Sequence, residues 1–240
     1  MTMEIRKIAT IRNDYTERFG VPRQSGLAPE VRSRIVFEKE YRNPDALRGI
    51  EGFTHLWLIW EFDRIERDGS YRPMVRPPKL GGNTRVGVWA TRSPYRPNPL
   101  GLTVVRLVGT EQTAEGPVLV VEGADLMNGT PIYDIKPYVP YADCVAGAVG
   151  GFADEHAGER LRVTVPEEVR AAAASAGHGE EWLAALAKVL SADPRPAYQN
   201  DPQRRYGMRY GDAEVAFVVN GGELTVTEIA NVVPEDAQTL

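Results

Sequence analysis

The residues best suited to chemistry in this sequence are arginines on a proline-rich stretch, residues 87–102 (GVWATRSPYRPNPLGL). Each of its three prolines fixes φ and removes a backbone donor, so the stretch is expected to be a stiff loop after a short strand. Arg92 and Arg96 lie on this loop. Guanidinium groups held in this way can bind a carboxylate or another anion. The alternative is a proline-rich surface turn with solvated arginines.

Few other residues offer chemistry. Three scattered histidines and one cysteine cannot complete a zinc site, so no metal is expected. The sequence has no nucleophile elbow, no P-loop and no dinucleotide-binding glycine motif after a strand. The remaining arginines, backbone donors and loop carboxylates suit binding and positioning better than nucleophilic catalysis.

The formal net charge of the 240 residues is −5, which argues against general coating of nucleic acid. Residues 69–110, however, contain no acidic residue and seven basic ones: Arg72, Arg76, Lys79, Arg85, Arg92, Arg96 and Arg106. This asymmetry indicates either a local anion-binding face or a solvated surface. The single cysteine, Cys144, excludes an intrachain disulfide and is expected to be packed. With no apolar run of membrane-spanning length and no secretory signal, a cytoplasmic protein is expected.

The elements expected to position the arginines are mostly strands. Alternating or densely apolar runs predict strands at residues 4–12, 33–38, 54–62, 86–91, 102–111, 117–126 and 132–138. A short helix should begin at Asn43 and Pro44, and the loops 19–29 and 69–84 are rich in proline and glycine. This pattern predicts a mainly β fold, a closed or sandwiched sheet, and excludes strand–helix alternation.

The composition changes after a glycine- and alanine-rich linker at residues 146–160. Helices are expected at 166–176 and 180–191, and a hairpin around the Asn220-Gly221-Gly222 turn at 214–229. We therefore predict two domains, residues 1–145 and 160–240, the second a small α+β unit.

Five sequence blocks carry a family resemblance: VPRQSGLAP, GFTHLWLIWEF, RPPKLGGNTRVGVWATRSPYRPNPLGLT, DLMNGTPIYDIKPYVPYAD and DPRPAY. In order and over nearly the whole chain, they resemble the TsaA/TrmO-like family of S-adenosylmethionine-dependent tRNA methyltransferases. The resemblance implies an N-terminal β-barrel methyltransferase domain, a small C-terminal domain and a homodimer. The implied reaction methylates the exocyclic amine of threonylcarbamoyladenosine at position 37 of tRNA, so the implied partner is the anticodon stem-loop.

The resemblance also implies the site. Cofactor contacts are expected from Pro22, Arg23, Gln24, Asp63, Arg64, Arg92, Leu102, Asn128, Gly129, Thr130 and Pro131. Leu102 would pack on the adenine ring, and Arg23 or Arg92 would hold the carboxylate of S-adenosylmethionine. Two positions depart from the family pattern: Asn128 replaces an aspartate, and Asp63 replaces a frequent histidine. Asn128 keeps the turn and an acceptor oxygen but loses the charge.

The sequence offers fewer candidates for binding the substrate. Arg96 or Arg195, with Tyr198, are candidates to hold the threonyl carboxylate, and Asp134 or Tyr138 could assist loss of the proton from the amine. Two alternatives stay open: a cofactor- or RNA-binding module without turnover, and a methyltransferase of the same fold with another acceptor.

Overall fold

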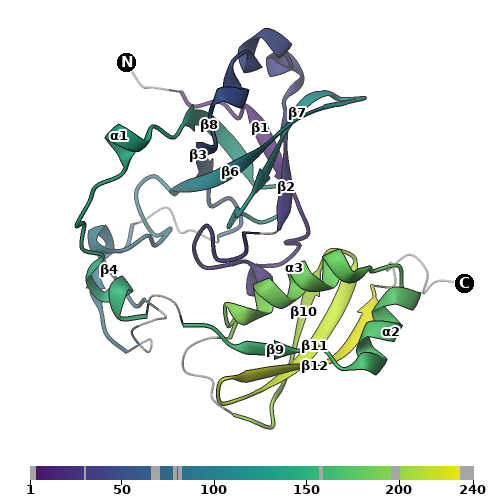
Figure 1. Ribbon diagram of the computed structural model, residues 1–240. Coiled ribbons are helices and arrows are strands. Elements are labelled where there is room, and N and C mark those ends of the chain that lie inside the picture. Colours follow the sequence, from purple (N-terminus) through teal and green to yellow (C-terminus); the bar gives the residue numbers. More distant parts are fainter. Residues whose placement is uncertain are drawn as a thin grey trace, which may run out of the picture.

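The N-terminal part of the chain is a six-stranded closed barrel with the strand order β1-β2-β7-β6-β3-β8 (Figure 1). The computed structural model describes residues 4–29, 31–65, 71–77, 80, 83–156, 159–195 and 201–232. The barrel strands are β1 (Ala9–Arg12), β2 (Arg32–Phe37), β3 (His55–Glu61), β6 (Leu100–Thr113), β7 (Gly116–Glu122) and β8 (Pro131–Pro137). All neighbouring strands run antiparallel, and the short β1–β8 pairing closes the ring.

Alternating apolar residues fill the barrel, as the period of a strand requires. Along β3, Leu56, Leu58 and Trp60 are buried while their neighbours are partly exposed. The interior of the barrel leaves no room for a side chain at position 101: a Cβ atom built on Gly101 would overlap the ring of Trp60. The glycine therefore allows the large indole to lie inside the barrel.

The C-terminal part is a four-stranded sheet of order β10-β11-β12-β9 with two helices. Its elements are β9 (Arg162–Thr164), α2 (Glu167–Ser175), α3 (Glu180–Ser191), β10 (Arg205–Tyr210), β11 (Ala213–Asn220) and β12 (Glu223–Asn231). Both helices begin with two glutamates, which favour the positive end of a helix. Their buried apolar faces, including Val169 and Leu186, share one core with the inner face of the sheet.

A segment of the N-terminal part contributes to this second core. Tyr15, Ala28 and Val31 are buried there together with the helices and the sheet. Backbone bonds reinforce the contact, since Gly211 N–H donates to the Asp14 carbonyl at 2.8 Å. The loop containing the VPRQ sequence is therefore held between the barrel and the C-terminal sheet.

Outside the two cores, β4 (Met74–Val75) pairs with β5 (Val86–Gly87), and α1 (Pro140–Asp143) follows β8. In Figure 1 the β4 region lies at the side of the molecule, beside the chain that descends from α1 to the C-terminal part. No described helix is long and apolar enough to cross a membrane.

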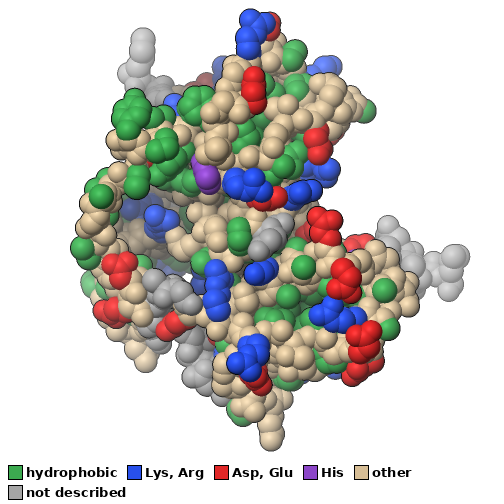
Figure 2. Space-filling view, in the orientation of Figure 1, with side chains coloured by type: hydrophobic (Ala, Val, Ile, Leu, Met, Phe, Trp, Pro, Cys, Tyr) green, Lys and Arg blue, Asp and Glu red, His purple; other side chains and the backbone are tan. Residues whose placement is uncertain are grey.

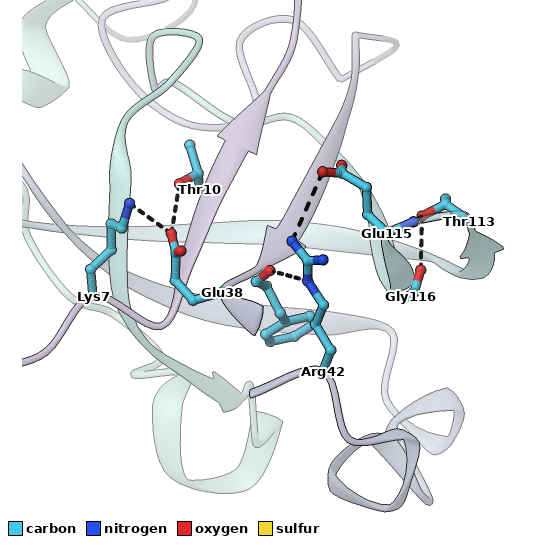
Figure 3. A network of polar contacts seen from close by, with 8 residues as sticks. Lys7, Thr10, Glu38, Arg42, Thr113, Glu115 and Gly116 are labelled. Carbon is cyan, nitrogen blue, oxygen red and sulfur yellow. Dashed lines mark hydrogen bonds and ion pairs between the residues drawn. The ribbon is translucent and has the colours of Figure 1, made fainter. Parts of the chain in front are cut away.

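One end of the barrel is fixed by polar contacts (Figure 3). Glu38 forms an ion pair with Lys7 Nζ at 2.6 Å and accepts a longer hydrogen bond from Thr10 Oγ1 at 3.4 Å. The hydrogen bond from Lys7 holds the pKa of the Glu38 carboxyl below its usual value. Arg42 donates from Nε to the Phe37 carbonyl at 2.8 Å. These contacts lie where β2 ends, away from the rim described below.

The prediction of a mainly β fold with a barrel and a small α+β unit is confirmed, as are the two helices and the hairpin. The boundaries 1–145 and 160–240 stay a prediction. Three local expectations are wrong, and two strands were missed. The first strand covers only 9–12, and residues 88–90 form a 3-10 helix instead of continuing a strand. Strands β9 and β10 were not predicted. Cys144 is exposed, because the chain around it lies on the surface.

Candidate active site

Most of the expected cofactor residues lie at one rim of the barrel. The register places the ends of β1, β3 and β7 beside the starts of β2, β6 and β8. The loops that leave these ends are also bonded to one another. Asn13 donates from Nδ2 to the Leu126 carbonyl at 2.9 Å, and Gly26 N–H donates to the Gly123 carbonyl at 3.0 Å. Residues distant in sequence therefore meet at this rim.

The first group at the rim joins the proline-rich loop to the VPRQ loop. Arg92 Nη1 donates a hydrogen bond of 2.6 Å to Gln24 Oε1. Arg92 is exposed, so the remaining donors of its guanidinium group face solvent or a ligand. The bond connects two loops separated by 68 residues and gives a cation a fixed position at the rim.

A buried polar chain supports this pair from inside the barrel. Trp60 Nε1 donates to Thr103 Oγ1 at 2.9 Å, and Thr103 Oγ1 donates to Asp125 Oδ1 at 2.7 Å. Burial raises the pKa of the Asp125 carboxyl, while the Thr103 hydrogen bond, the backbone of Ser25 and the charge of Arg92 act in the opposite direction. Asp125 thus places a carboxylate behind the arginine and the VPRQ loop.

The second group is the turn before β8. Gly129 has φ of 88°, which favours glycine, and its N–H donates to the Ile11 carbonyl at 2.9 Å. Arg64 Nη2 donates to the Asn128 carbonyl, and a Cβ atom at position 129 would lie 2.9 Å from that nitrogen. Asp63 lies beside Arg64, with 3.9 Å between the closest charged atoms. The turn is therefore backed by a guanidinium group.

The other expected cofactor residues are close in sequence but differ in exposure. Thr130 is buried and Pro131 begins β8. Leu102, next to Thr103 in β6, is 55% exposed and faces outward at the rim, where an apolar ring could pack on it. The backbone turn, the arginines and this exposed leucine are the kinds of group that a ligand with an aromatic ring and a carboxylate requires.

Arg23 is bonded to the C-terminal part and not to the Gln24–Arg92 pair. Its guanidinium group donates to the Arg195 carbonyl, and burial lowers its pKa. With Pro22 and Asp193, it lines a small cavity of about 70 Å³ between the VPRQ loop and the end of α3. The structure thus separates Pro22 and Arg23 from Gln24, which faces the rim.

The expected substrate arginines are both used within the protein. Arg96 Nη1 donates to the carbonyl oxygens of Val88 at 3.0 Å and Thr91 at 2.6 Å. Arg195 is only 8% exposed and donates from Nε and Nη2 to the two Asp193 carboxylate oxygens, each at 2.9 Å. Tyr198 lies outside the described residues.

The two candidates for proton removal lie along β8 rather than together. Asp134 forms an ion pair with Lys136 at 3.0 Å and accepts from the Ile135 amide at 2.9 Å. Tyr138 N–H donates to the His55 carbonyl, at the start of β3. This is the opposite end of the barrel, about 23 Å from Pro131 at 3.3 Å per residue. Within one chain, Tyr138 is not brought to the rim.

Sequence reasoning missed two polar pairs near the rim. Thr103 directly follows Leu102, and Asp125 lies three residues before Asn128, but the spacing of the two residues in the sequence does not indicate that they are in contact. Tyr133 O–H donates to a Glu61 carboxylate oxygen across β8 and β3, and burial together with Glu61 raises the pKa of Tyr133 to about 12. Their only sequence signal was polar residues at the end of apolar strands.

Comparison with solved structures places the fold among TrmO proteins. A crystal structure of TrmO from Pseudomonas aeruginosa is 32% identical, covers 96% of this chain and all of its own, and superposes with a TM-score of 0.75. A second TrmO crystal structure gives a TM-score of 0.77 at 33% identity, again covering 96% of this chain and 100% of its own.

Family models define the relationship further. The model of the tRNA-methyltransferase O N-terminal domain matches residues 10–144, and that of the TrmO C-terminal domain matches residues 158–232. The chain belongs to the tRNA-methyltransferase O family, which confirms the resemblance noted in the sequence.

Three curated relatives carry names of activities. The tRNA (adenine(37)-N6)-methyltransferase of Escherichia coli is 38% identical over 82% of this chain and 84% of its own. The protein of the same name from Eikenella corrodens is 44% identical over 71% and 93%. A Pseudomonas aeruginosa protein, provisionally named S-adenosylmethionine-dependent methyltransferase RcsF, is 42% identical over 90% and 92%.

Proposed function

We propose that this protein transfers the methyl group of S-adenosylmethionine to the exocyclic N6 amine of adenosine 37 in tRNA, and that the adenosine carries a threonylcarbamoyl group. The observation that carries the proposal is the hydrogen bond between Gln24 and Arg92 at the barrel rim, in a chain matched by the family models at both ends. The names of the relatives support position 37. The threonylcarbamoyl group is our extension from the sequence blocks.

The chemistry of the rim fits S-adenosylmethionine. Arg92 is exposed and can donate to a carboxylate, the exposed Leu102 offers an apolar surface for an adenine, and the turn at Gly129 brings backbone atoms close to the rim. The Asp125 carboxylate behind Arg92 balances part of the positive charge. When bound, S-adenosylmethionine would supply an electrophilic methyl group on its sulfonium sulfur.

The residues of this chain would act by positioning. Gln24 fixes Arg92, Arg64 fixes the turn at Asn128, and both loops are anchored to the barrel, so a bound ligand would meet groups that need little reorganisation. Of the two proton acceptors, Asp134 is tied to Lys136 and Ile135 and would have to exchange one of these contacts for the substrate.

We also propose a homodimer, because Tyr138 can approach a rim only if that rim belongs to another copy. In such an assembly, the loop around Arg96 would complete the partner's site. Light scattering of the protein, combined with a methylation assay, tests this: a monomer that methylates tRNA at full rate contradicts the dimer and removes Tyr138 as a candidate.

The decisive experiment is nucleoside analysis by mass spectrometry. The purified protein and S-adenosylmethionine are incubated with two forms of one tRNA, an unmodified transcript and one carrying threonylcarbamoyladenosine. One added methyl group on the modified nucleoside alone supports the full proposal. Methylation of plain adenosine 37 would correct the acceptor, methylation elsewhere would indicate another acceptor class, and cofactor binding without turnover would indicate a binding module.

Arg92→Ala tests the site itself. Loss of a charge-assisted hydrogen bond costs about 1.5–3 kcal/mol, so cofactor affinity should fall about 10- to 150-fold by calorimetry. Arg48→Ala is the matched control, because Arg48 is exposed and pairs with Asp45 at the end of the 3-10 segment Pro44–Leu47. Equal cofactor affinity of both variants would remove Arg92 from the site.

A further inference from the structure

Two aromatic side chains are displayed on the surface of the proline-rich loop region. Trp89 is 66% exposed and Tyr71 is 48% exposed. Their rings are stacked at 22°, with 6.3 Å between ring centroids. Large rings usually bury most of their area, so a paired and exposed set suggests a surface that meets a flat ligand.

The backbone under these rings is rigid. Val88, the residue before Trp89, is fully buried, and its N–H donates to the Pro73 carbonyl at 2.9 Å. The β4–β5 pairing joins the two segments that carry the rings. Arg96 Nη1 bonds the carbonyl oxygens at both ends of the 3-10 turn, Val88 and Thr91. The two rings are thus presented in a fixed arrangement that costs little entropy on binding.

Arginines lie on the same segments as the two rings, and one of them contacts Trp89. The Arg96 guanidinium carbon lies 5.1 Å from the Trp89 ring centroid, and that of Arg72 lies 4.3 Å from the Tyr95 ring centroid. Arg76 and Arg85 are exposed on the same loops. No aspartate or glutamate occurs between residues 69 and 110. In Figure 2, Lys and Arg side chains also line the hollow between the barrel and the C-terminal part.

We propose that Trp89 and Tyr71 form a stacking platform for an unpaired base of an RNA loop, with the surrounding arginines contacting its phosphates. Every base has a π-face that can stack on an aromatic ring, and guanidinium groups neutralise the adjacent backbone. The inference rests on the proposed function for the identity of the RNA, the anticodon loop of tRNA. Trp89 lies three residues before Arg92 in the chain, so the platform would hold a neighbouring nucleotide near the cofactor rim.

The charge decides between RNA and other flat or apolar partners. A second apolar protein surface would bury the guanidinium groups of Arg72 and Arg96 without adding counter-charges, which is costly. A single-stranded RNA satisfies rings and cations together. The combination of a stacked aromatic pair and a segment with seven basic and no acidic residues between 69 and 110 therefore favours a nucleic acid.

The test measures binding of a fluorescent RNA hairpin with a seven-nucleotide loop, and of a fully paired duplex of the same length, by anisotropy. Stacking by one base predicts that Trp89→Ala weakens hairpin binding by about one to two orders of magnitude. Trp89→Phe should retain most of the affinity, and duplex binding should change little in either variant. Tyr141→Ala is the matched control, since Tyr141 is 92% exposed on α1 outside the platform.

Two further measurements keep the interpretation clear. Cofactor affinity by calorimetry should be the same in Trp89→Ala and the unaltered protein, which shows that the neighbouring rim is intact. Arg76→Ala should weaken hairpin binding and reduce the slope of log affinity against log salt by about one. Unchanged hairpin affinity in Trp89→Ala overturns the platform, as does a change of oligomeric state in that variant, which would assign Trp89 to an interface between copies.

The platform and the proposed reaction can fail separately. If tRNA is methylated at position 37 and Trp89→Ala binds hairpin RNA normally, the platform is wrong and the function stands. If no tRNA is methylated but Trp89→Ala loses hairpin binding and the paired duplex is unaffected, the platform stands and the function is wrong.

Discussion

Replacing Thr103 by valine should disconnect the polar chain that supports the rim. The hydroxyl group accepts from Trp60 Nε1 at 2.9 Å and donates to Asp125 Oδ1 at 2.7 Å, and Thr103 is 2% exposed. Valine has nearly the same shape, so no cavity is created. The substitution instead leaves an indole N–H without its acceptor and a carboxylate without one of its donors.

Each buried polar group that loses its partner costs about 1–3 kcal/mol. The Asp125 carboxylate keeps its hydrogen bond with the Ser25 backbone and the nearby charge of Arg92, so its loss of free energy should lie at the lower end of this range. Together the two losses should lower the free energy of unfolding by about 2–4 kcal/mol. Urea denaturation followed by circular dichroism measures this value.

The loss should depend on pH. Burial raises the folded-state pKa of Asp125, and removal of the Thr103 hydrogen bond should raise it further. A carboxyl group with a raised folded pKa favours the native state when protonated, and this stability is lost as pH rises through the folded pKa. Thr103→Val should therefore be more destabilising at pH 8 than at about pH 4.

Thr110→Val is the control, because it makes the same chemical change on the same strand at an exposed position. We expect it to change the free energy of unfolding by less than about 0.5 kcal/mol. If Thr103→Val is equally mild, or equally destabilising at both pH values, the Trp60–Thr103–Asp125 chain is not a significant support of the native state.

Two other substitutions test the barrel. Gly101→Ala should destabilise the barrel by about 1–3 kcal/mol, because the new methyl group must displace the Trp60 ring. Gly109→Ala is the control, because a methyl group at that position of the same strand meets open space. Thermal denaturation should give a lower midpoint for Gly101→Ala than for Gly109→Ala, and equal midpoints would contradict the overlap with Trp60. Lys7→Ala should remove part of the stability that the Glu38 carboxylate contributes, which is present above the unfolded-state pKa of Glu38 and is lost as pH falls through its lowered folded-state pKa. The loss should be below about 1 kcal/mol, because both side chains are exposed. Urea midpoints at pH 7 and pH 3 should therefore differ less in the variant than in the unaltered protein.

The strand content was predictable because inward and outward positions alternate in a barrel. Leu56, Leu58 and Trp60 follow that period and are buried in β3. The same period failed at Val86, Val88 and Ala90. Val88 is buried, but the chain forms a 3-10 turn there, since its backbone bonds to Pro73 and the following turn is fixed by Arg96. Such long-range partners leave no local signal.

The candidate site was predictable in residue type more than in arrangement. Sequence blocks identified Gln24 and Arg92, but only the fold shows that they bond each other across 68 residues. Arg23 is adjacent to Gln24 yet turns towards the C-terminal part, because the segment between Tyr15 and Val31 is packed into the second core. An arginine's position in a block cannot reveal whether its donors are already used within the protein.

Asn128 departs from the family pattern, but the turn that contains it does not depend on an aspartate. Its Oδ1 accepts from the Asn13 amide at 3.3 Å, a bond that an aspartate would accept equally well. The positive φ of Gly129 and the bond from Arg64 to the Asn128 carbonyl involve backbone atoms alone at this turn. The turn therefore forms without a carboxylate at position 128. The missing charge leaves the Asp63 carboxylate, 3.9 Å from Arg64, as the acidic group paired with the guanidinium group at this turn.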